Sequence, residues 1–238
     1  MKIDIWSDIA CPYCYIGKRK LEMALSRFPY KDNIELVWHS YELDPDLPQK
    51  ASESNIYSYF AGKHNTSVDE ARETMANTAK LAKEAGLNFD YDNLVVANTS
   101  GALRLVKLAD ESNLATEAEE ALFDAYFVKG EDISNKNTLV KLGAQTGLKE
   151  NAIMEMLDSD NYLDKIKEDT EYGENELDLE YIPFYVFNNN RIVQGSIPVE
   201  DYLEVLTRSY AEWEQNGAPS GKGEIIGGRS CSIDGVCS

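Results

Sequence analysis

Hydrophobic residues gather in three stretches that predict β-strands. Residues 2–7 form a short apolar run, residues 33–41 alternate β-branched and aromatic residues with polar ones, and residues 181–187 begin with a Tyr-Ile-Pro sequence. Short runs of this composition are typical of strands that are buried on at least one face. An Asn-rich turn at 188–190 and a β-branched run at 191–195 predict that the third strand continues into an antiparallel hairpin.

Between the first two strands the apolar residues recur with the spacing of a helix. This helix is predicted to start at Cys11 and to end near Phe28. Strand, helix and strand in this order form a βαβ unit. We therefore expect the strands at 2–7 and 33–41 to be parallel, with a right-handed crossover.

The middle of the chain, from about residue 55 to residue 160, carries only helical patterns. Ser67 and Glu70 have the spacing of a capping box, which marks the start of one of these helices. A further helix is predicted at about 161–174, and a last one after Pro198. Three methionines of this middle region are expected to fill gaps in its core: Met75, Met154 and Met156.

The amino-acid composition limits the kinds of molecule that the protein is expected to bind. The 238 residues are enough for one large domain or two small ones, and 42 acidic against 23 basic residues give a net charge of −19. Nucleic acids and anionic membranes are therefore not expected as partners, because binding phosphate requires clustered Lys and Arg. The chain runs directly into its first strand without the apolar segment of a signal peptide, so a cytoplasmic location is expected.

The candidate chemistry lies in the Cys-Pro-Tyr-Cys sequence of residues 11–14. Cys11 falls at the N-cap of the first predicted helix and Pro12 at its first position, where proline is favoured. The free N–H groups and the dipole of a helix start stabilise an anion, so a reactive thiolate is favoured at Cys11. Cys14 lies one turn further on, within reach of a disulfide, and is expected to be the more shielded thiol.

The same spacing also occurs in other kinds of site. Two cysteines separated by two residues can be half of a zinc site or two inert core thiols. The preceding strand, the proline and the aromatic Tyr13 favour redox chemistry. No metal and no cofactor are predicted.

A second pair, Cys231 and Cys237, lies in a Gly- and Ser-rich tail that begins at about residue 217. Their spacing closes a small loop and would stabilise the fold little. We therefore predict a second redox pair that exchanges with the first. The alternatives are a small surface disulfide and two idle thiols.

The order of these elements resembles the DsbA-like branch of the thioredoxin superfamily, and within it the FrnE-like group. The resemblance rests on the motif at residues 8–19, on Glu-Leu-Asp-Pro at 42–45 and on Ile-Pro-Phe-Tyr-Val-Phe at 182–187. It implies an α/β thioredoxin fold with a large inserted α-helical domain. The expected domains are 1–52 with 160–238 for the thioredoxin part and 53–159 for the insertion.

The resemblance also implies roles for individual residues. Cys11 is expected to attack a disulfide and Cys14 to resolve the mixed disulfide, with Pro12 and Tyr13 between them. Pro183 is expected to be cis and to lie against the cysteines, where Ile182 and its backbone pair with the substrate. Periplasmic DsbA proteins usually carry His where this chain has Tyr13, so a strongly oxidising role is not predicted.

The predicted function is therefore a thiol–disulfide oxidoreductase for protein or low-molecular-weight disulfides and thiols. One alternative is a glutathione-dependent isomerase or transferase of the 2-hydroxychromene-2-carboxylate isomerase/kappa type, which shares the architecture and needs no resolving thiol. Another is a module in which all four cysteines bind zinc. The two histidines, His39 and His64, and the aromatic residues Trp6 and Tyr185 are expected to have structural roles.

Overall fold

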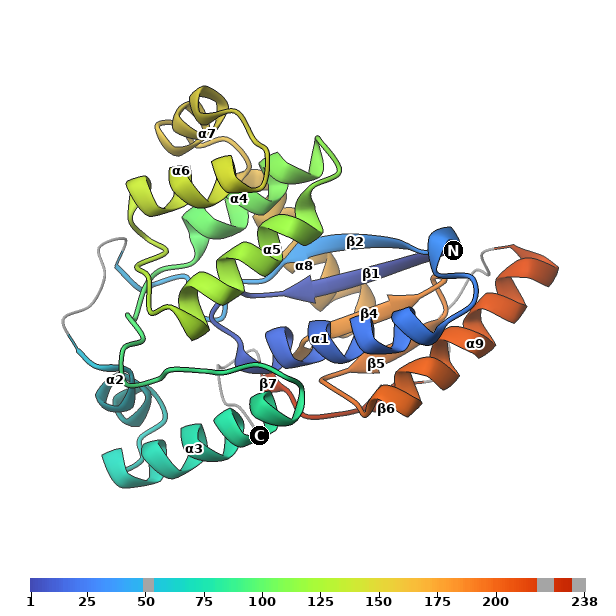
Figure 1. The fold of residues 1–238 in the computed structure, drawn as a ribbon, viewed down its shortest axis with the longest axis horizontal. Helices are drawn as coiled ribbons and strands as arrows, with labels where there is room; N and C mark the ends of the chain where they lie inside the picture. Colours follow the sequence, from blue (N-terminus) through green and yellow to red (C-terminus); the bar gives the residue numbers. More distant parts are fainter. Residues whose placement is uncertain (49–53, 218–224, 233–238) are drawn as a thin grey trace. The chain divides into compact units, whose positions relative to one another are not determined.

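The computed structural model describes residues 1–48, 54–217 and 225–232 (Figure 1). The chain divides into two compact units, of which one joins Met1–Tyr41 to Lys167–Ser238 and the other is Glu42–Ile166. We refer to them as the sheet unit and the helical unit. The insertion expected at residues 53–159 lies inside the bounds of the helical unit.

The sheet unit contains a five-stranded sheet with the order β2-β1-β4-β5-β6. Its strands are β1 (Lys2–Ser7), β2 (Glu35–Ser40), β4 (Phe184–Phe187), β5 (Arg191–Gln194) and β6 (Ile225–Gly227). The predicted parallel pairing of β1 with β2 and the predicted antiparallel hairpin of β4 and β5 are both confirmed. β4 pairs antiparallel with β1 and thereby joins the two halves of the unit into one sheet.

Helices cover both faces of this sheet. α1 (Pro12–Arg27) and α9 (Val199–Asn216) pack against each other on one face, and α8 (Leu163–Leu177) lies on the other (Figure 1). Successive side chains of a strand point to opposite faces. Trp6 of β1 accordingly points to α8, where its indole N–H donates to the Asp169 carbonyl at 2.9 Å.

The tail forms more regular structure than its Gly- and Ser-rich composition indicates. β6 joins β5 as a parallel edge strand, and β7 (Cys231–Ser232) pairs antiparallel with β3 (Tyr181–Ile182). Neither strand is predicted from the sequence. The β-branched pair Ile225-Ile226 was the available signal, but it is too short to be recognised without the neighbouring strand that it joins.

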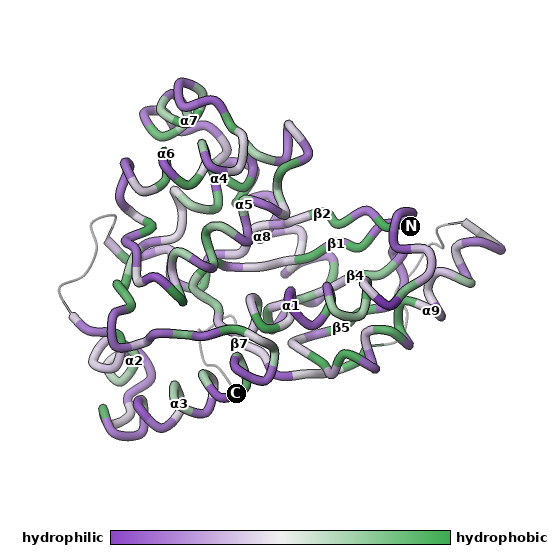
Figure 2. The backbone as a smooth tube through the Cα atoms, viewed as in Figure 1, coloured by the Kyte–Doolittle hydropathy of each residue, from purple (hydrophilic) through white to green (hydrophobic). Residues whose placement is uncertain are grey.

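The helical unit consists of short amphipathic helices. They are α2 (Ile56–Lys63), α3 (Val68–Glu84), α4 (Ser100–Asp110), α5 (Ala115–Phe123), α6 (Lys136–Gln145) and α7 (Glu150–Leu157), with a π-helical turn at Asp124–Val128. The capping box of Ser67 and Glu70 is confirmed at the start of α3. Hydrophilic and hydrophobic residues alternate along α3 (Figure 2), and its buried side includes Ala71, Met75 and Ala82.

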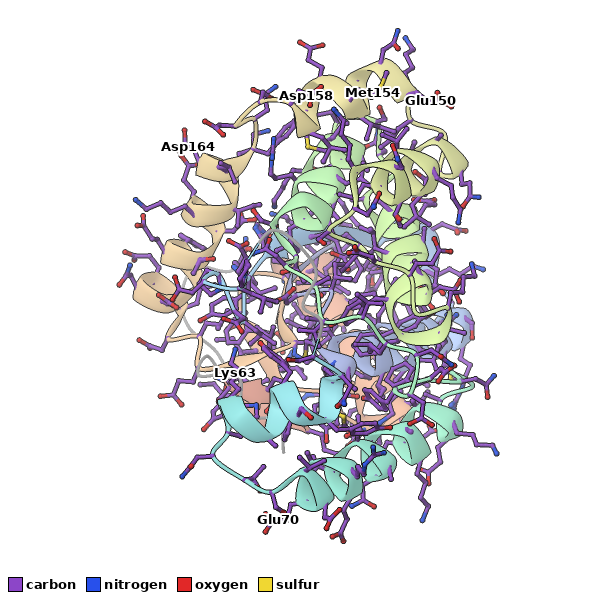
Figure 3. All side chains as sticks on the ribbon, turned by 90° about the vertical axis from the view of Figure 1, so that its left-hand side faces the viewer. Lys63, Glu70, Glu150, Met154, Asp158 and Asp164 are labelled. Carbon is purple, nitrogen blue, oxygen red and sulfur yellow. The ribbon has the colours of Figure 1, made fainter. Side chains whose placement is uncertain are left out.

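The prediction for the methionines is partly wrong. Met75 and Met156 are buried, whereas Met154 is 38% exposed. Figure 3 shows Met154 on the outer side of α7 beside Glu150 and Asp158. These positions differ by four residues and share one face of the helix, so Met154 belongs to the solvent side of α7.

No helix in the described part of the chain combines the length and the apolar character that crossing a membrane requires.

Candidate active site

The Cys-Pro-Tyr-Cys sequence forms the first turn of α1, at the end of the sheet where β1 stops. Cys11 is the N-cap, with extended backbone angles, and Pro12 occupies the first helical turn, as predicted. The Cys11 N–H donates to the Asp8 carbonyl at 3.0 Å, and the Cys14 N–H donates to the Cys11 carbonyl at 3.1 Å. The Cys11 side chain makes no capping hydrogen bond to the helix.

Both cysteines of this motif are free thiols. The exposed fraction is 0% for Cys11 and 2% for Cys14, so both thiols are buried and the expectation that Cys14 is the more shielded one stays a prediction. The thiol of Cys11 points to the Ile182 carbonyl oxygen, at 3.8 Å from its sulfur. This neighbour comes from a strand 171 residues away in the chain and could not be read from the local motif.

The structure brings Ile182 and Pro183 to this pair. The Ile182–Pro183 peptide bond is cis, as the resemblance implied. A Cβ placed on Gly17, one turn after Cys14, would lie 3.2 Å from the Pro183 ring. The first turns of α1 and the Ile-Pro segment therefore form one site.

Cys231 lies at the same site, because it pairs with Ile182 in the β3–β7 ladder. It is buried and disulfide-bonded, whereas its predicted partner Cys237 lies outside the described residues. A disulfide sulfur offers no thiolate to a metal, so the four-cysteine zinc module is not supported. Within the described residues no group of three or more His, Cys, Asp or Glu side chains could hold a metal ion.

The environment of Cys14 keeps this thiol protonated. Burial raises its pKa well above the ordinary value, and the hydrogen bond to Cys11 and the charge of Cys11 raise it further. The Asp8 N–H and the Ser7 hydroxyl act in the opposite direction and are the weaker influences. A thiol at Cys14 that donates to Cys11 stabilises negative charge on the Cys11 sulfur.

Two buried tyrosines lie beneath α1 at this point. The rings of Tyr185 in β4 and Tyr202 in α9 meet edge to face with centroids 5.5 Å apart. A Cβ on Gly17 would collide with the Tyr185 hydroxyl and would lie 3.4 Å from the Tyr202 hydroxyl. Tyr185 is buried, as its predicted core position requires. Nothing in the sequence indicates that its hydroxyl lies near the cysteines.

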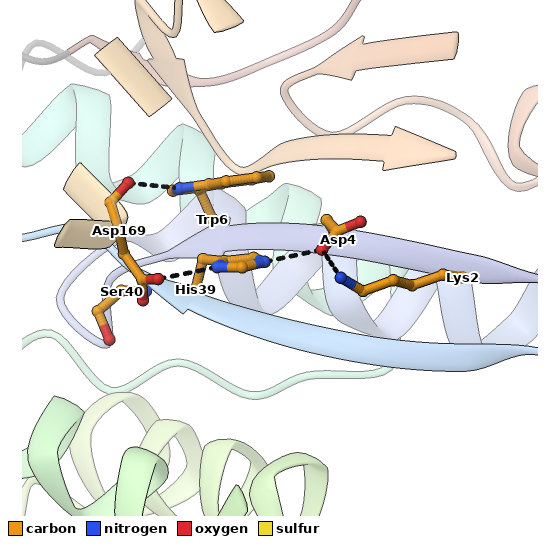
Figure 4. A network of polar contacts seen from close by, with 6 residues as sticks. All are labelled: Lys2, Asp4, Trp6, His39, Ser40 and Asp169. Atoms are coloured by element: carbon orange, nitrogen blue, oxygen red, sulfur yellow. Dashed lines mark hydrogen bonds and ion pairs between the residues drawn. The ribbon is translucent and has the colours of Figure 1, made fainter. Parts of the chain in front are cut away.

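The opposite face of β1 carries a second polar group, the His39 cluster, built from Asp4, His39 and Asp169 (Figure 4). The two ring nitrogens of His39 lie 2.9 Å from Asp169 Oδ1 and 2.8 Å from Asp4 Oδ1. Burial alone would lower the pKa of His39, but the hydrogen bonds and charges of the two carboxylates outweigh burial and raise it.

Further contacts complete the His39 cluster. Trp6 stacks on the imidazole with ring centroids 4.1 Å apart. The Ser40 N–H donates to Asp169 Oδ2 at 2.7 Å, and Lys2 Nζ lies 2.6 Å from Asp4 Oδ1. The cluster ties β1 and β2 to α8, in agreement with the expected structural role of His39.

The chain matches the family model of the DSBA-like thioredoxin domain over residues 2–207. It belongs to this family. Among solved structures, the probable DsbA oxidoreductase SCO1869 from Streptomyces coelicolor is similar with a TM-score of 0.83 and 27% identity, covering 100% of this chain and 98% of that one. The α/β thioredoxin fold with a helical insertion is therefore confirmed.

Two more distant structures share the fold at lower identity. The cytosolic disulfide reductase DsbM from Pseudomonas aeruginosa has a TM-score of 0.59 and 16% identity, covering 90% of this chain and 98% of that one. A 2-hydroxychromene-2-carboxylate isomerase has a TM-score of 0.63 and 13% identity, covering 92% of this chain and 100% of that one. DsbA-like thioredoxin folds thus occur in proteins with different activities.

Proposed function

We propose that this DsbA-like protein is a thiol–disulfide oxidoreductase with Cys11 as nucleophile and Cys14 as resolving thiol. The observation that carries the proposal is the pair of free thiols in the first turn of α1, one of which is held protonated and donates to the other. That arrangement supports a developing thiolate on Cys11, at the positive end of the helix dipole.

The reaction consists of two exchanges. The Cys11 thiolate attacks one sulfur of a substrate disulfide, forms a mixed disulfide and releases the other sulfur as a thiolate. Cys14 then attacks Cys11 Sγ, and the electron pair of the broken bond leaves on the second substrate sulfur. The substrate disulfide is reduced to two thiols and the two cysteines are oxidised. The reverse sequence oxidises a substrate.

The remaining site residues bind the substrate. Ile182 and Pro183 supply backbone beside Cys11, and an extended peptide would pair with such a backbone edge. Pro12 and Tyr13 lie between the two thiols in the first turn of α1, where Pro12 fixes the helix start. We assign the protein to the FrnE-like group on the motifs at 8–19, 42–45 and 182–187.

The substrates we propose are protein disulfides and low-molecular-weight disulfides or thiols, in the cytoplasm. The likeness to the cytosolic reductase DsbM, which has also been solved with GSH, supports a small thiol as one partner. We also propose that Cys231 and Cys237 form a second redox pair. Its support is the pairing of disulfide-bonded Cys231 with Ile182, next to Cys11.

Trapping of the mixed disulfide tests the proposal. The reduced protein is mixed with oxidised glutathione and the products are identified by mass spectrometry after acid quenching. We expect Cys11→Ser to form no adduct and Cys14→Ser to accumulate a Cys11–glutathione adduct. Iodoacetamide should modify Cys11 much faster than Cys14 at neutral pH, and equal rates would contradict the assignment.

The same variants address the glutathione-dependent isomerase. An isomerase or transferase of that type needs no resolving thiol. If the protein were such an enzyme, the Cys14→Ser variant would keep the full glutathione-dependent turnover of the wild type. In an oxidoreductase, the Cys14→Ser variant instead stops at the mixed disulfide. Retention of full activity by Cys14→Ser would favour the isomerase.

A further inference from the structure

Two buried hydroxyl groups near Cys14 lack a polar partner. The hydroxyl oxygens of Ser7 and Tyr185 are both buried and reach no nitrogen or oxygen with hydrogen-bonding geometry. Buried polar groups in proteins are nearly always hydrogen-bonded, because an unpaired hydroxyl keeps the full cost of its lost hydration. Two such groups at one site require a reason other than packing.

Ser7 is the last residue of β1, and the turn that follows it leads directly into the cysteine motif. Burial is the main influence on the pKa of Cys14 and raises it, whereas the Ser7 hydroxyl and the Asp8 N–H lower it. A group that lowers the pKa of a thiol favours its thiolate. The Ser7 hydroxyl is therefore one of the groups around Cys14 that favour its thiolate.

Tyr185 approaches Cys14 from the sheet. Gly17 follows Cys14 by three residues and shares its face of α1. The Tyr185 hydroxyl lies so close to Gly17 that any Cβ there would collide with it. Glycine thus leaves the space that lets this hydroxyl reach the helix one turn from Cys14.

The character of the Tyr185 hydroxyl fits a hydrogen-bond donor. Burial raises its pKa well above the ordinary value. The charge of Tyr202, a side-chain contact with the Tyr202 hydroxyl that falls short of hydrogen-bond geometry, and then charge on Cys14 and Cys11 act in the same direction. Tyr185 therefore remains neutral and keeps its proton. Charge on Cys14 affects it more than charge on Cys11 does.

We infer that Ser7 and Tyr185 are positioning residues whose hydroxyls stabilise negative charge on the Cys14 sulfur while it resolves the mixed disulfide. This inference rests on the proposed oxidoreductase function. In that step a bond forms between Cys14 Sγ and Cys11 Sγ, and the bond from Cys11 Sγ to the substrate sulfur breaks. Its electron pair stays on the substrate sulfur, which takes up the proton that Cys14 loses.

The two hydroxyls explain how a deeply buried thiol can ionise during turnover. Donors that are already in place when charge develops need no reorganisation at that moment. Their unpaired state in the reduced protein is the cost of this arrangement, and the cost is recovered when the thiolate forms. Charge on Cys11 affects Tyr185 less than charge on Cys14 does, so we expect the hydroxyls to matter more for resolution than for the attack by Cys11.

Single-turnover kinetics with oxidised glutathione separate the two steps. Acid quenching and mass spectrometry follow the Cys11–glutathione adduct as it forms and as it converts to the Cys11–Cys14 disulfide. Loss of one hydrogen bond to the thiolate should raise the pKa of Cys14 by about one unit. The thiolate fraction then falls about tenfold, while its nucleophilicity rises about threefold.

For Ser7→Ala and for Tyr185→Phe we therefore expect resolution to slow about threefold at neutral pH, with adduct formation unchanged. The pH at which resolution reaches its plateau should rise in both variants. Ser7→Thr keeps the hydroxyl and should restore the rate. Tyr185→Phe removes an unpaired buried group, so its free energy of unfolding should stay the same or increase.

Matched controls are Ser209→Ala and Tyr210→Phe, which remove buried hydroxyls that do have partners, in Arg191 and Asn33. Both should leave resolution unchanged. Normal resolution in Ser7→Ala and Tyr185→Phe would overturn the inference and leave the oxidoreductase function intact. Absence of both a Cys11–glutathione adduct in Cys14→Ser and a Cys11–Cys14 disulfide in the wild-type protein would overturn both.

Discussion

The two faces of strand β1 carry polar groups in opposite states. On the face toward α8, His39 bonds a carboxylate through each ring nitrogen, and the cluster extends to the Ser40 backbone and Lys2. On the face toward α1, the hydroxyl of Ser7 and the nearby hydroxyl of Tyr185 have no nitrogen or oxygen partner. The paired and the unpaired site thus lie on opposite faces of one six-residue strand.

The difference gives a criterion for separating buried polar groups that stabilise the fold from those that take part in a reaction. A network whose members are hydrogen-bonded to one another stabilises one conformation and has few free donors or acceptors for a reacting group. A site with free donors is less stable in the resting state but can receive a charge when it appears. By this criterion His39 belongs to the scaffold, although histidine is a common catalytic residue.

The largest effect on stability is expected from removing the cation of the paired site. His39→Gln leaves Asp4 and Asp169 facing each other without the imidazolium between them. Breaking a largely buried charged network in this way costs about 3 kcal/mol. Urea unfolding should show this loss, while the rates of disulfide exchange remain those of the wild type. His64→Gln, at the end of α2, is the control and should change stability by less than about 0.5 kcal/mol.

A loss of exchange activity in a folded His39→Gln protein would contradict the separation of the two faces. Asp169→Asn would then show whether the effect passes through α8, because it keeps the shape of the side chain that bonds His39 and Ser40.

The next effect concerns the unpaired site. Gly17→Ala brings a Cβ into the Tyr185 hydroxyl, and overpacking of this kind costs about 1–3 kcal/mol. The double variant Gly17→Ala/Tyr185→Phe removes the oxygen that collides and should recover most of the loss. Gly62→Ala in α2 is the matched control, because its Cβ meets nothing within 4 Å. That control should be neutral or stabilising, since alanine is the better helix former.

A smaller effect is the pH dependence of the stability that the His39 cluster contributes. The pKa of His39 is raised in the folded protein. Its contribution to the free energy of unfolding is therefore complete below the pKa of about 6.5 that it has in the unfolded chain, and is lost as the pH rises through the pKa in the folded protein. The folded pKa of Asp4 is lowered, chiefly by His39 and Lys2 against the effect of burial. Its contribution is present above about pH 4 and is lost as the pH falls through the folded pKa.

The stability difference between wild type and His39→Gln should therefore be largest between about pH 4 and pH 6.5 and decrease on either side. Urea unfolding at a series of pH values measures it. A difference that grows steadily above pH 7 would show that His39 is neutral in the folded protein.

The sequence predicted what depends on local patterns. The strand at residues 2–7, the helix start at Cys11 and the capping box of α3 are each set by residues within a few positions, and all are confirmed. What it did not predict depends on partners far along the chain. β7 exists because Cys231 pairs with Ile182, and the Tyr185 hydroxyl meets Gly17 only after β4 has joined β1.

The last prediction concerns the tail and has the smallest expected effect on turnover. The structure places disulfide-bonded Cys231 opposite Ile182, whose carbonyl oxygen is 3.8 Å from the Cys11 sulfur. A Cys11 thiolate can therefore attack the Cys231 sulfur at high effective concentration. The attack forms a Cys11–Cys231 bond, breaks the existing disulfide and leaves its partner sulfur as the thiolate.

In the Cys14→Ser variant this intermediate cannot be resolved, so peptide mapping should find a Cys11–Cys231 or Cys11–Cys237 disulfide. The variant Cys11→Ser/Cys14→Ser is the control and should show neither. Turnover of the Cys231→Ser/Cys237→Ser variant should change only modestly, because substrate chemistry at Cys11 and Cys14 does not require the tail. Absence of a trapped disulfide under mild oxidation, together with unchanged turnover, would assign Cys231 to a structural disulfide. The chemistry would then be confined to the site between β1, α1 and the Ile182–Pro183 segment.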